Sequence, residues 1–193
     1  PALEKILNER KLIWVGANQA GNERLRVDRW GLAVDAAWHL QKLYRIDANR
    51  IYAAGHSGGG RAASVLALLY PDVFRGALMF MGVDWYRDLP VADRPGAHWP
   101  APFGKPPHDL LRLARERSRL VLITGETDFN RAETRVVDKE MRRDDFQHAF
   151  GAFLTFDVAQ IGDGAIVSTS AVTPSSSTRP AGPCAAASSA RRT

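Results

Sequence analysis

The chain has 193 residues, of which 45% are hydrophobic and 24% charged, a composition that predicts a soluble globular domain with an appendage. No apolar run is long enough to span a bilayer, and the single cysteine, Cys184, excludes an intrachain disulfide and a thiolate metal cluster. The net charge of +5 is spread among carboxylates and lacks the aromatic-interleaved basic stripe that is typical of nucleic-acid binding.

Strand-like and helix-like segments alternate along the chain. Short apolar runs predict strands at 11–15, 50–54, 74–83, 120–124 and 153–158. Helical spacing of apolar residues, or a composition rich in helix formers, predicts helices at 2–9, 28–45, 61–70 and 132–143. This order predicts the α/β class, with a mostly parallel, doubly wound sheet covered by helices on both faces. Ligands of such sheets bind beyond the carboxyl ends of the strands.

Two segments depart from this pattern. Residues 88–109 carry six prolines together with His98, Trp99 and Phe103, which is typical either of a loop over the binding site or of a solvent-exposed excursion. From 165 to 193 the chain is rich in Ala, Ser and Thr and has no periodicity, so we expect a disordered tail after a domain that covers 1–164.

The motif Gly55-His56-Ser57-Gly58-Gly59 fits G-x-S-x-G and lies between a predicted strand and a predicted helix. This is the context of a nucleophile elbow, a sharp turn that exposes the serine hydroxyl and needs glycine where side chains would clash. The backbone N–H of Gly58 would then lie at a helix N-terminus and donate to an oxyanion. The alternatives are a glycine-rich turn with an incidental serine and a phosphate-binding loop, although no lysine follows at Walker spacing.

A serine nucleophile needs a histidine base, and the histidine needs a carboxylate that orients it. Asp128 follows the predicted strand 120–124 and is the candidate acid. Glu126 is the rival carboxylate. The purely structural alternative is that Asp128 or Asn130 caps the next helix.

Taken together, residues 11–164 resemble the polyhydroxybutyrate depolymerase and feruloyl esterase branch of the α/β-hydrolase fold. Five motifs carry this resemblance: Trp14-Val15-Gly16-Ala17-Asn18, Ile46-Asp47-Ala48-Asn49-Arg50-Ile51-Tyr52, Gly55-His56-Ser57-Gly58-Gly59-Gly60, Tyr70-Pro71-Asp72-Val73-Phe74-Arg75-Gly76 and Gly125-Glu126-Thr127-Asp128-Phe129-Asn130-Arg131. The resemblance implies that Ser57 is the nucleophile, Asp128 the acid and Gly58 one oxyanion donor. The reaction it implies is acyl transfer to water through an acyl-enzyme.

The chain differs from this family at both ends. The family has further strands before 11, and a loop after one of them supplies the second oxyanion donor. Here only the helix-like segment 2–9 precedes, and the chain begins at Pro1 without an initiator methionine or signal peptide. We therefore expect an incomplete hydrolase fold that lacks its N-terminal strands, in a chain that is processed or a fragment, with secretion among the compartments left open. The family's base follows the last strand in a Gly-His pair, where this chain has Gly162-Asp163-Gly164.

Five histidines are candidates to replace the missing base. We expect His39 on a helix surface, His56 in the lining of the acyl site and His148 at the opposite end of the sheet from Ser57. His98 and His108 lie in the proline-rich segment and are the two that could reach the serine.

The leading interpretation is a serine hydrolase that cleaves carboxylic esters, small or polymeric, with His56, Trp99 and Phe103 lining the substrate site. It requires no cofactor, since no HExxH or paired-cysteine motif gathers metal ligands, and it predicts no nucleic-acid or membrane partner. The oligomeric state stays open. The alternative is a catalytically silent hydrolase-like fragment, with Asp163 in place of the base, that at most binds a ligand through Trp85, Trp99 and Phe103. A third interpretation is a basic interaction protein that associates with polyanions.

Overall fold

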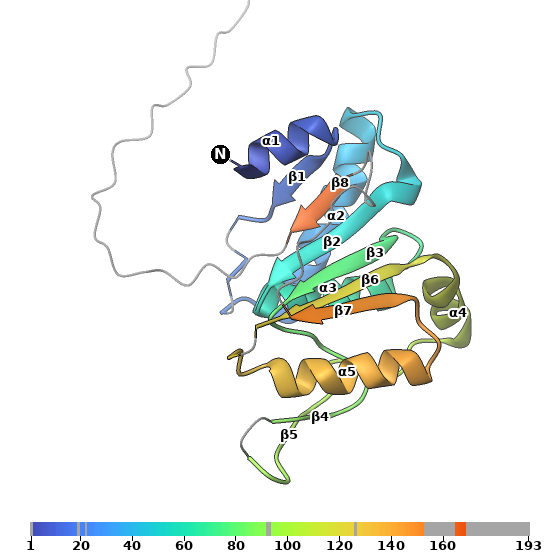
Figure 1. The fold of residues 1–193 in the computed structure, drawn as a ribbon. Coiled ribbons are helices and arrows are strands. Elements are labelled where there is room, and N and C mark those ends of the chain that lie inside the picture. Colours follow the sequence, from blue (N-terminus) through green and yellow to red (C-terminus); the bar gives the residue numbers. More distant parts are fainter. Residues whose placement is uncertain are drawn as a thin grey trace, which may run out of the picture.

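A six-stranded sheet forms the centre of the molecule in the computed structural model, which describes residues 2–18, 20–21, 23–91, 94–125, 127–152 and 165–168 (Figure 1). In spatial order the strands are β1 (Ile13–Gly16), β8 (Ala165–Ser168), β2 (Ile51–His56), β3 (Gly76–Phe80), β6 (Arg119–Thr124) and β7 (His148–Ala152). Every pairing within this sheet is parallel. The chain therefore belongs to the α/β class, as the alternation of elements predicts.

One described helix precedes the first strand, and the others lie in connections between strands. The helices are α1 (Ala2–Glu9), α2 (Arg26–Leu43), the 3-10 helix η1 (Ala48–Arg50), α3 (Gly58–Leu69), α4 (His108–Arg117) and α5 (Arg131–Arg143). The four predicted helices are confirmed, α1 with the predicted ends and the other three with shifted ends, and α4 is an addition. The helix α3 ends immediately before Tyr70 and Pro71, since proline cannot donate the next backbone hydrogen bond and restricts the residue before it.

The two faces of the sheet are covered unequally. Alternate strand residues such as Ile51, Ala53 and Leu122 enter the larger core, to which α2, α3, α4 and α5 all contribute buried side chains. Their sequence neighbours Tyr52 and Ala54 face the other way, into a smaller cluster against which Leu7 of α1 packs. This alternation is the two-residue period of a strand. Helices therefore reach both faces, as expected, but α1 is the only described helix that contributes to the smaller cluster.

The end of the sheet differs from the expectation. The strand β7 ends at Ala152, just before the strand predicted at 153–158, a segment that lies outside the described residues. Residues 165–168, expected at the start of a disordered tail, instead form β8 between β1 and β2, so the sheet extends past the boundary predicted at 164. The unpaired N–H and C=O groups of two neighbouring strand edges favour an inserted strand, which a composition-based assignment does not take into account. The rest of the expected tail lies outside the described residues.

Part of the proline-rich segment is an ordered hairpin. Two short strands, β4 (Leu89–Pro90) and β5 (His98–Trp99), pair antiparallel, with Leu89 opposite Trp99. The hairpin is anchored because Leu89 is buried in the core and the Asp88 carboxylate accepts a hydrogen bond from the backbone of Ala101 at 2.8 Å. The contacts of Asp88 and Leu89 therefore hold this hairpin against the domain.

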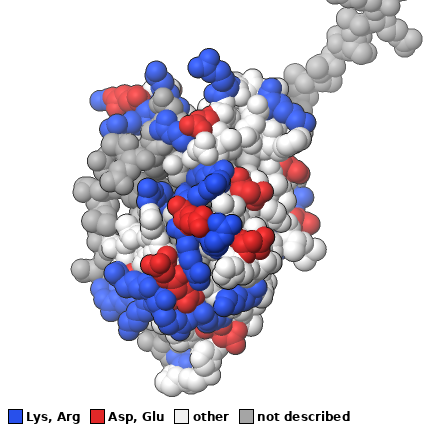
Figure 2. All heavy atoms as spheres, turned by 90° about the vertical axis from the view of Figure 1, so that its right-hand side faces the viewer, with Lys and Arg blue, Asp and Glu red and all other residues white. Residues whose placement is uncertain are grey.

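Opposite charges are mixed on the molecular surface. Figure 2 shows basic and acidic side chains side by side on one face. Oppositely charged side chains form ion pairs, among them Arg112 with Glu116 and Arg142 with Asp138. This surface gives no specific support to the interpretation as a polyanion-binding protein. Among the described residues, no helix combines the length and apolar character needed to cross a membrane.

Candidate functional site

Ser57 occupies a strained turn at the carboxyl ends of the parallel strands. This end of the sheet is called the carboxyl edge below, and the end at which the strands begin is called the amino edge. It follows the last residue of β2 and precedes the first residue of α3, and its backbone angles are φ 53° and ψ −118°. A positive φ is unfavourable for a residue with a Cβ and costs on the order of 1–3 kcal/mol. The turn is held by hydrogen bonds from Ser57 N to Phe80 O at 2.8 Å and from Arg61 N to Ser57 O at 3.1 Å. Strain that the surrounding structure maintains in this way is a common feature of functional sites.

Two glycines allow the close approach of backbone that this turn requires. A Cβ on Gly55 would overlap the backbone of Gly59, and a Cβ on Gly82 would overlap the carbonyl oxygen of Ser57. The need for glycine at Gly55 follows from the motif. The role of Gly82, which lies after β3, is visible only in the folded chain.

Asp128 follows β6 and shares a cavity with Ser57. This cavity of about 280 Å³ is also lined by His56, Met81, Gly125, Thr127, Phe129 and Asn130. The structure thus brings together the predicted nucleophile and the predicted acid, which are far apart in the sequence. Glu126, the rival acid, lies outside the described residues.

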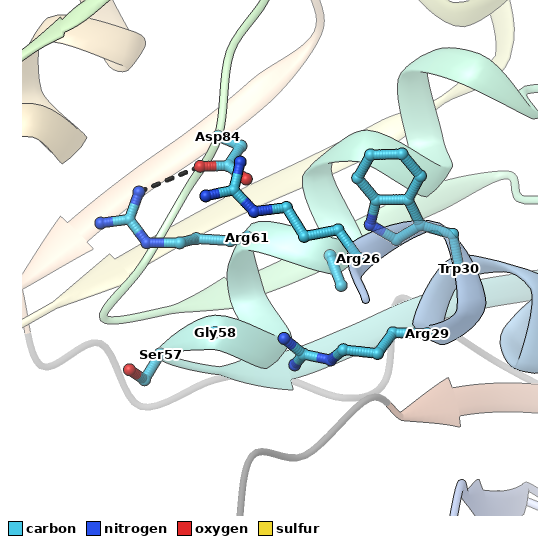
Figure 3. Close-up of a pocket in the computed structure, with 8 residues that line it drawn as sticks. Arg26, Arg29, Trp30, Ser57, Gly58, Arg61 and Asp84 are labelled. Carbon is cyan, nitrogen blue, oxygen red and sulfur yellow. Dashed lines mark hydrogen bonds and ion pairs between the residues drawn. The ribbon is translucent and has the colours of Figure 1, made fainter. Parts of the chain in front are cut away.

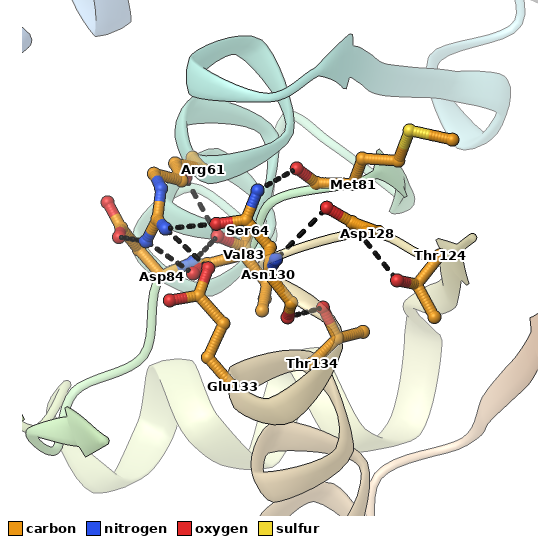
Figure 4. Close-up of polar contacts among 10 residues, drawn as sticks. All are labelled: Arg61, Ser64, Met81, Val83, Asp84, Thr124, Asp128, Asn130, Glu133 and Thr134. Carbon is orange, nitrogen blue, oxygen red and sulfur yellow. Dashed lines mark hydrogen bonds and ion pairs between the residues drawn. The ribbon is translucent and has the colours of Figure 1, made fainter. Parts of the chain in front are cut away.

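The acid loop is the connection from β6 to α5, of which residues 125 and 127–130 are described, and both carboxylate oxygens of Asp128 accept hydrogen bonds in or next to it. Oδ2 accepts from the hydroxyl of Thr124 at 2.7 Å, and Oδ1 accepts from the backbone N–H of Asn130 at 3.0 Å (Figure 4). Asn130 is the N-cap residue of α5, so Asp128 also orders the entry to that helix, which is part of the structural alternative. These bonds fix the position of the carboxylate at the cavity.

Ser57 lines two further cavities. One, of about 250 Å³, is bounded by Arg26, Arg29, Trp30, Ser57, Gly58, Arg61, Ala62 and Asp84 (Figure 3). The other, of about 240 Å³, is bounded by Arg26, Ser57, Arg61, Asp84, Trp99, Pro100, Phe129 and Asn130. The hairpin therefore contributes to the surroundings of Ser57 through Trp99, as expected if the proline-rich segment covers the site. Phe129, of the acid loop, lines two of the three cavities and is 72% exposed.

A polar cluster behind the site connects α3 to the acid loop. Arg61 donates hydrogen bonds to Asp84 at 3.0 Å and to the Asn130 side chain at 3.1 Å, and it pairs with Glu133 (Figure 4). Asn130 in turn donates to the carbonyl of Met81 at 2.8 Å. Glu133 is 3% exposed, and burial raises its pKa to about 7 against the opposing effect of Arg61. The cluster holds the acid loop in place relative to the elbow.

Sequence reasoning missed Arg26, Arg29, Arg61, Asp84 and Glu133. The available signal was limited: Arg61 lies one helical turn after Ser57, and Arg26 and Arg29 are three residues apart, so each pair shares a helix face. Nothing local indicates that α2 and α3 place these arginines at one cavity.

Two of the five histidines lie at opposite ends of the strands of the central sheet. His148 is the first residue of β7, with its Nε2 2.8 Å from Asp138 Oδ1 and its Nδ1 3.0 Å from the carbonyl of Phe146. Both ring nitrogens are thus engaged at the amino edge, away from Ser57, as expected. His56 lines the cavity that Ser57 and Asp128 share. His39, on α2, is exposed, and neither His98 nor His108 lines any of the three cavities at Ser57.

The aromatic candidates have different roles. Trp99 lines a cavity with Ser57. Phe103 instead packs edge-on against Tyr86, with ring centroids 6.4 Å apart, and lines none of the three cavities at Ser57. Trp85, suggested as a ligand contact, is 0% exposed and stacks on Tyr86, so that assignment is wrong. Its apolar ring is a core element that the sequence pattern did not distinguish from a loop aromatic.

Gly58 begins α3 and lines a cavity with Ser57. The first N–H groups of a helix have no intrahelical acceptor and lie at the positive end of its dipole, which is the type of donor that stabilises an oxyanion. The described residues contain no group of three or more His, Cys, Asp or Glu side chains arranged to hold a metal ion. Gly162, Asp163 and Gly164 lie outside the described residues.

Comparisons of the chain with protein-family models, curated proteins and solved structures found no match. The geometry around Ser57 is therefore what bears on function.

Proposed function

We propose that this chain is a serine hydrolase of the α/β-hydrolase fold that cleaves carboxylic esters through an acyl-enzyme on Ser57. The observation that carries the proposal is the positive φ of Ser57 at a strand-to-helix junction, in a cavity shared with Asp128. A strained serine at a helix N-terminus, in a cavity with a carboxylate, supplies two parts of the arrangement that acyl transfer uses, the nucleophile and the acid.

In the proposed reaction, Ser57 Oγ attacks the ester carbonyl carbon and its proton passes to a base. The N–H of Gly58 stabilises the oxyanion, and the C–O bond to the alcohol breaks as the alcohol takes up the proton. Water then attacks the acyl-enzyme, which releases the carboxylic acid and restores the Ser57 hydroxyl. Asp128 would orient the base and stabilise its protonated form.

The reaction also needs a base, and among the described residues no histidine donates to Asp128, whose oxygens accept hydrogen bonds from Thr124 and Asn130. Of the described histidines, His56 is the one that lines the shared cavity. The alternative of a catalytically silent, ligand-binding scaffold is therefore tested by the same experiment as the esterase.

The experiment is labelling with a fluorophosphonate probe, followed by intact-protein mass measurement. The expected result is a single adduct that is lost in Ser57→Ala and kept in Ser118→Ala, a control at a buried serine that caps the end of α4. Circular dichroism and cooperative thermal unfolding establish that each sample is folded. A folded wild-type protein that forms no adduct would contradict the esterase and favour the silent scaffold.

A further inference from the structure

Asn130 is a helix N-cap residue whose side chain does not cap its helix. It precedes α5, all of whose residues are described, and its side chain makes no capping hydrogen bond to that helix. Asparagine is favoured at an N-cap because its side-chain oxygen can accept a hydrogen bond from the first turn. Asn130 is 4% exposed, so its amide has to find other partners inside the protein. These partners show what the side chain does.

The two polar atoms of the Asn130 amide bind two different segments of the chain. Oδ1 accepts a hydrogen bond from Nη2 of Arg61 at 3.1 Å, and Nδ2 donates to the carbonyl oxygen of Met81 at 2.8 Å (Figure 4). A guanidinium group only donates and a carbonyl only accepts, so a single orientation of the amide satisfies both partners. An aspartate of the same shape would lack the donor for Met81.

Two hydrogen-bonded routes lead from this amide to the turn at Ser57. Along the first, Arg61 holds Asn130 with its side chain and donates its backbone N–H to the carbonyl of Ser57 at 3.1 Å. Along the second, Met81 directly follows Phe80, whose carbonyl accepts the N–H of Ser57 at 2.8 Å. Met81 has a φ of 50°, an unfavourable conformation that the surrounding hydrogen bonds maintain. The amide thus connects to both segments that hold the serine.

The backbone of Asn130 is bonded to the proposed acid. Its N–H donates to Oδ1 of Asp128 at 3.0 Å, while Thr124 at the end of β6 donates to Oδ2 at 2.7 Å. Thr124 therefore fixes the carboxylate to its own strand, whereas Asn130 fixes it to the segments that hold Ser57. A displacement of Asn130 would change the placement of the carboxylate relative to the serine.

We infer that Asn130 is a positioning residue, whose side-chain amide sets the place of Asp128 relative to Ser57. The inference rests on the proposed function. Asn130 acts through Arg61 and Met81 and not on the ester itself. A carboxylate displaced by about 1 Å would misplace the base that it orients, and a displacement of that size can reduce a rate about 10²-fold.

The test compares two Asn130 variants with a matched variant that perturbs the same residue in another way. Asn130→Ala removes both hydrogen bonds of the amide, and Asn130→Asp keeps the acceptor for Arg61 but loses the donor to Met81. Thr134→Val removes a hydroxyl that donates to the backbone carbonyl of Asn130 at 2.9 Å, and it leaves the amide intact. All three variants disturb the start of α5, but only the first two alter the amide.

The first measurement is the rate of fluorophosphonate labelling at Ser57, under conditions in which circular dichroism shows each variant to be folded. We expect labelling about 10²-fold slower in Asn130→Ala and about tenfold slower in Asn130→Asp. Thr134→Val should label at the wild-type rate, even where its midpoint of urea unfolding falls as far as that of the Asn130 variants. A purely structural role of Asn130 would lower the midpoint without slowing the labelling.

The second measurement does not require a reactive serine. Amide hydrogen exchange, followed by NMR, compares the N–H of Ser57 with that of Leu122 on the interior strand β6. The ratio of the two exchange rates should rise at least about tenfold in Asn130→Ala, because the turn that holds Ser57 is released locally. The ratio should keep its wild-type value in Thr134→Val.

Wild-type rates of labelling in folded Asn130→Ala and Asn130→Asp would overturn the inference, as would equal slowing by Thr134→Val. If Asn130→Ala does not fold, Asn130→Asp, which has the same shape as the wild type, decides the question. A folded wild type that forms no adduct would contradict the esterase, and the exchange ratio then decides the inference alone. A raised ratio would support the positioning role of Asn130 without the esterase, and an unchanged ratio would overturn both.

Discussion

The two ends of α5 carry polar clusters that differ in burial and in electrostatic balance. At the carboxyl edge of the sheet, Glu133 lies deep in the protein with Arg61, and burial raises its pKa to about 7. At the amino edge, Asp144 accepts hydrogen bonds from Tyr86 and from Arg87, which is 3.0 Å away. Burial opposes ionisation of Asp144, but these bonds outweigh it and place its pKa below 3.8.

This difference in the balance of charge indicates a different role for each edge. The amino edge stabilises its charges with nearby partners, which favours a simple structural role. The carboxyl edge has both an incompletely compensated carboxylate, that of Glu133, and a serine with positive φ, and such costs are typical of functional sites. The contrast predicts that substitutions at the carboxyl edge have larger effects and the opposite pH dependence.

The largest effect is expected for Arg61→Gln. This change removes the cation from Glu133 and Asp84, and we expect a loss of roughly 3 kcal/mol in the free energy of unfolding near neutral pH. The loss should shrink toward about pH 5, where Glu133 takes up a proton and no longer needs the cation. Urea unfolding at both pH values measures this, and an equal loss at both would show that Glu133 is not the group concerned.

The next effect is the pH dependence that Glu133 causes. Between its ordinary value of 4.5 and its folded value of about 7, the folded protein keeps a proton that the unfolded chain releases. The free energy of unfolding should therefore fall as pH rises through this window, by on the order of 2 kcal/mol, and level off above it. Glu133→Gln should remove this slope, as measured by urea unfolding across the window. A slope that persists in Glu133→Gln would assign the dependence to another group.

Much of the fold could be predicted because its signals are local. The helix α3 follows from a run of Ala and Leu that Pro71 terminates, and β2 follows from an apolar run before a glycine-rich turn. The strand β8 could not be predicted in this way. Its place between β1 and β2 depends on strand edges that are more than 100 residues earlier in the sequence, as the pairing of Ala165 with Ile13 and with Ile51 illustrates.

The residues of the site likewise divide into those that local sequence signals predict and those that depend on packing. Ser57 and Asp128 could be placed at one edge because each follows a predicted strand, and the carboxyl ends of parallel strands lie together. Arg29 and Glu133 could not, because charged residues on helices are usually solvated and only the packing of α2 and α5 shows that these two are buried. Trp85 was misassigned for the converse reason, since an aromatic residue between strands can belong to the core or to a ligand site.

At the amino edge, Asp144→Asn tests the opposite sign of pH dependence. Because the pKa of Asp144 is lowered, its ionised form stabilises the fold above the unfolded value of 3.8, and this contribution is lost as pH falls below it. We expect a cost of about 1–2 kcal/mol near neutral pH, since the partly exposed network loses charge-assisted bonds from Arg87 and Tyr86. The wild type loses this contribution as pH falls, whereas Asp144→Asn has already lost it. The free energy of unfolding of the variant, measured by acid unfolding, should therefore fall less below pH 3.8 than that of the wild type. A cost that grows toward low pH would contradict this assignment.

The smallest effect is expected for His148→Gln, which distinguishes a structural histidine from a base. The ring lies 2.8 Å from Asp138 on α5, and a glutamine amide can replace part of that contact. We expect a loss of about 1 kcal/mol in the free energy of unfolding and an unchanged rate of fluorophosphonate labelling at Ser57. His56→Gln is the matched variant at the carboxyl edge, where the side chain is exposed and lines the cavity with Ser57. It should slow labelling with little change in stability, because an exposed side chain contributes little to folding. If His148→Gln slows labelling instead, the two edges are coupled through α5, and the separation of structural from functional charge along that helix does not hold.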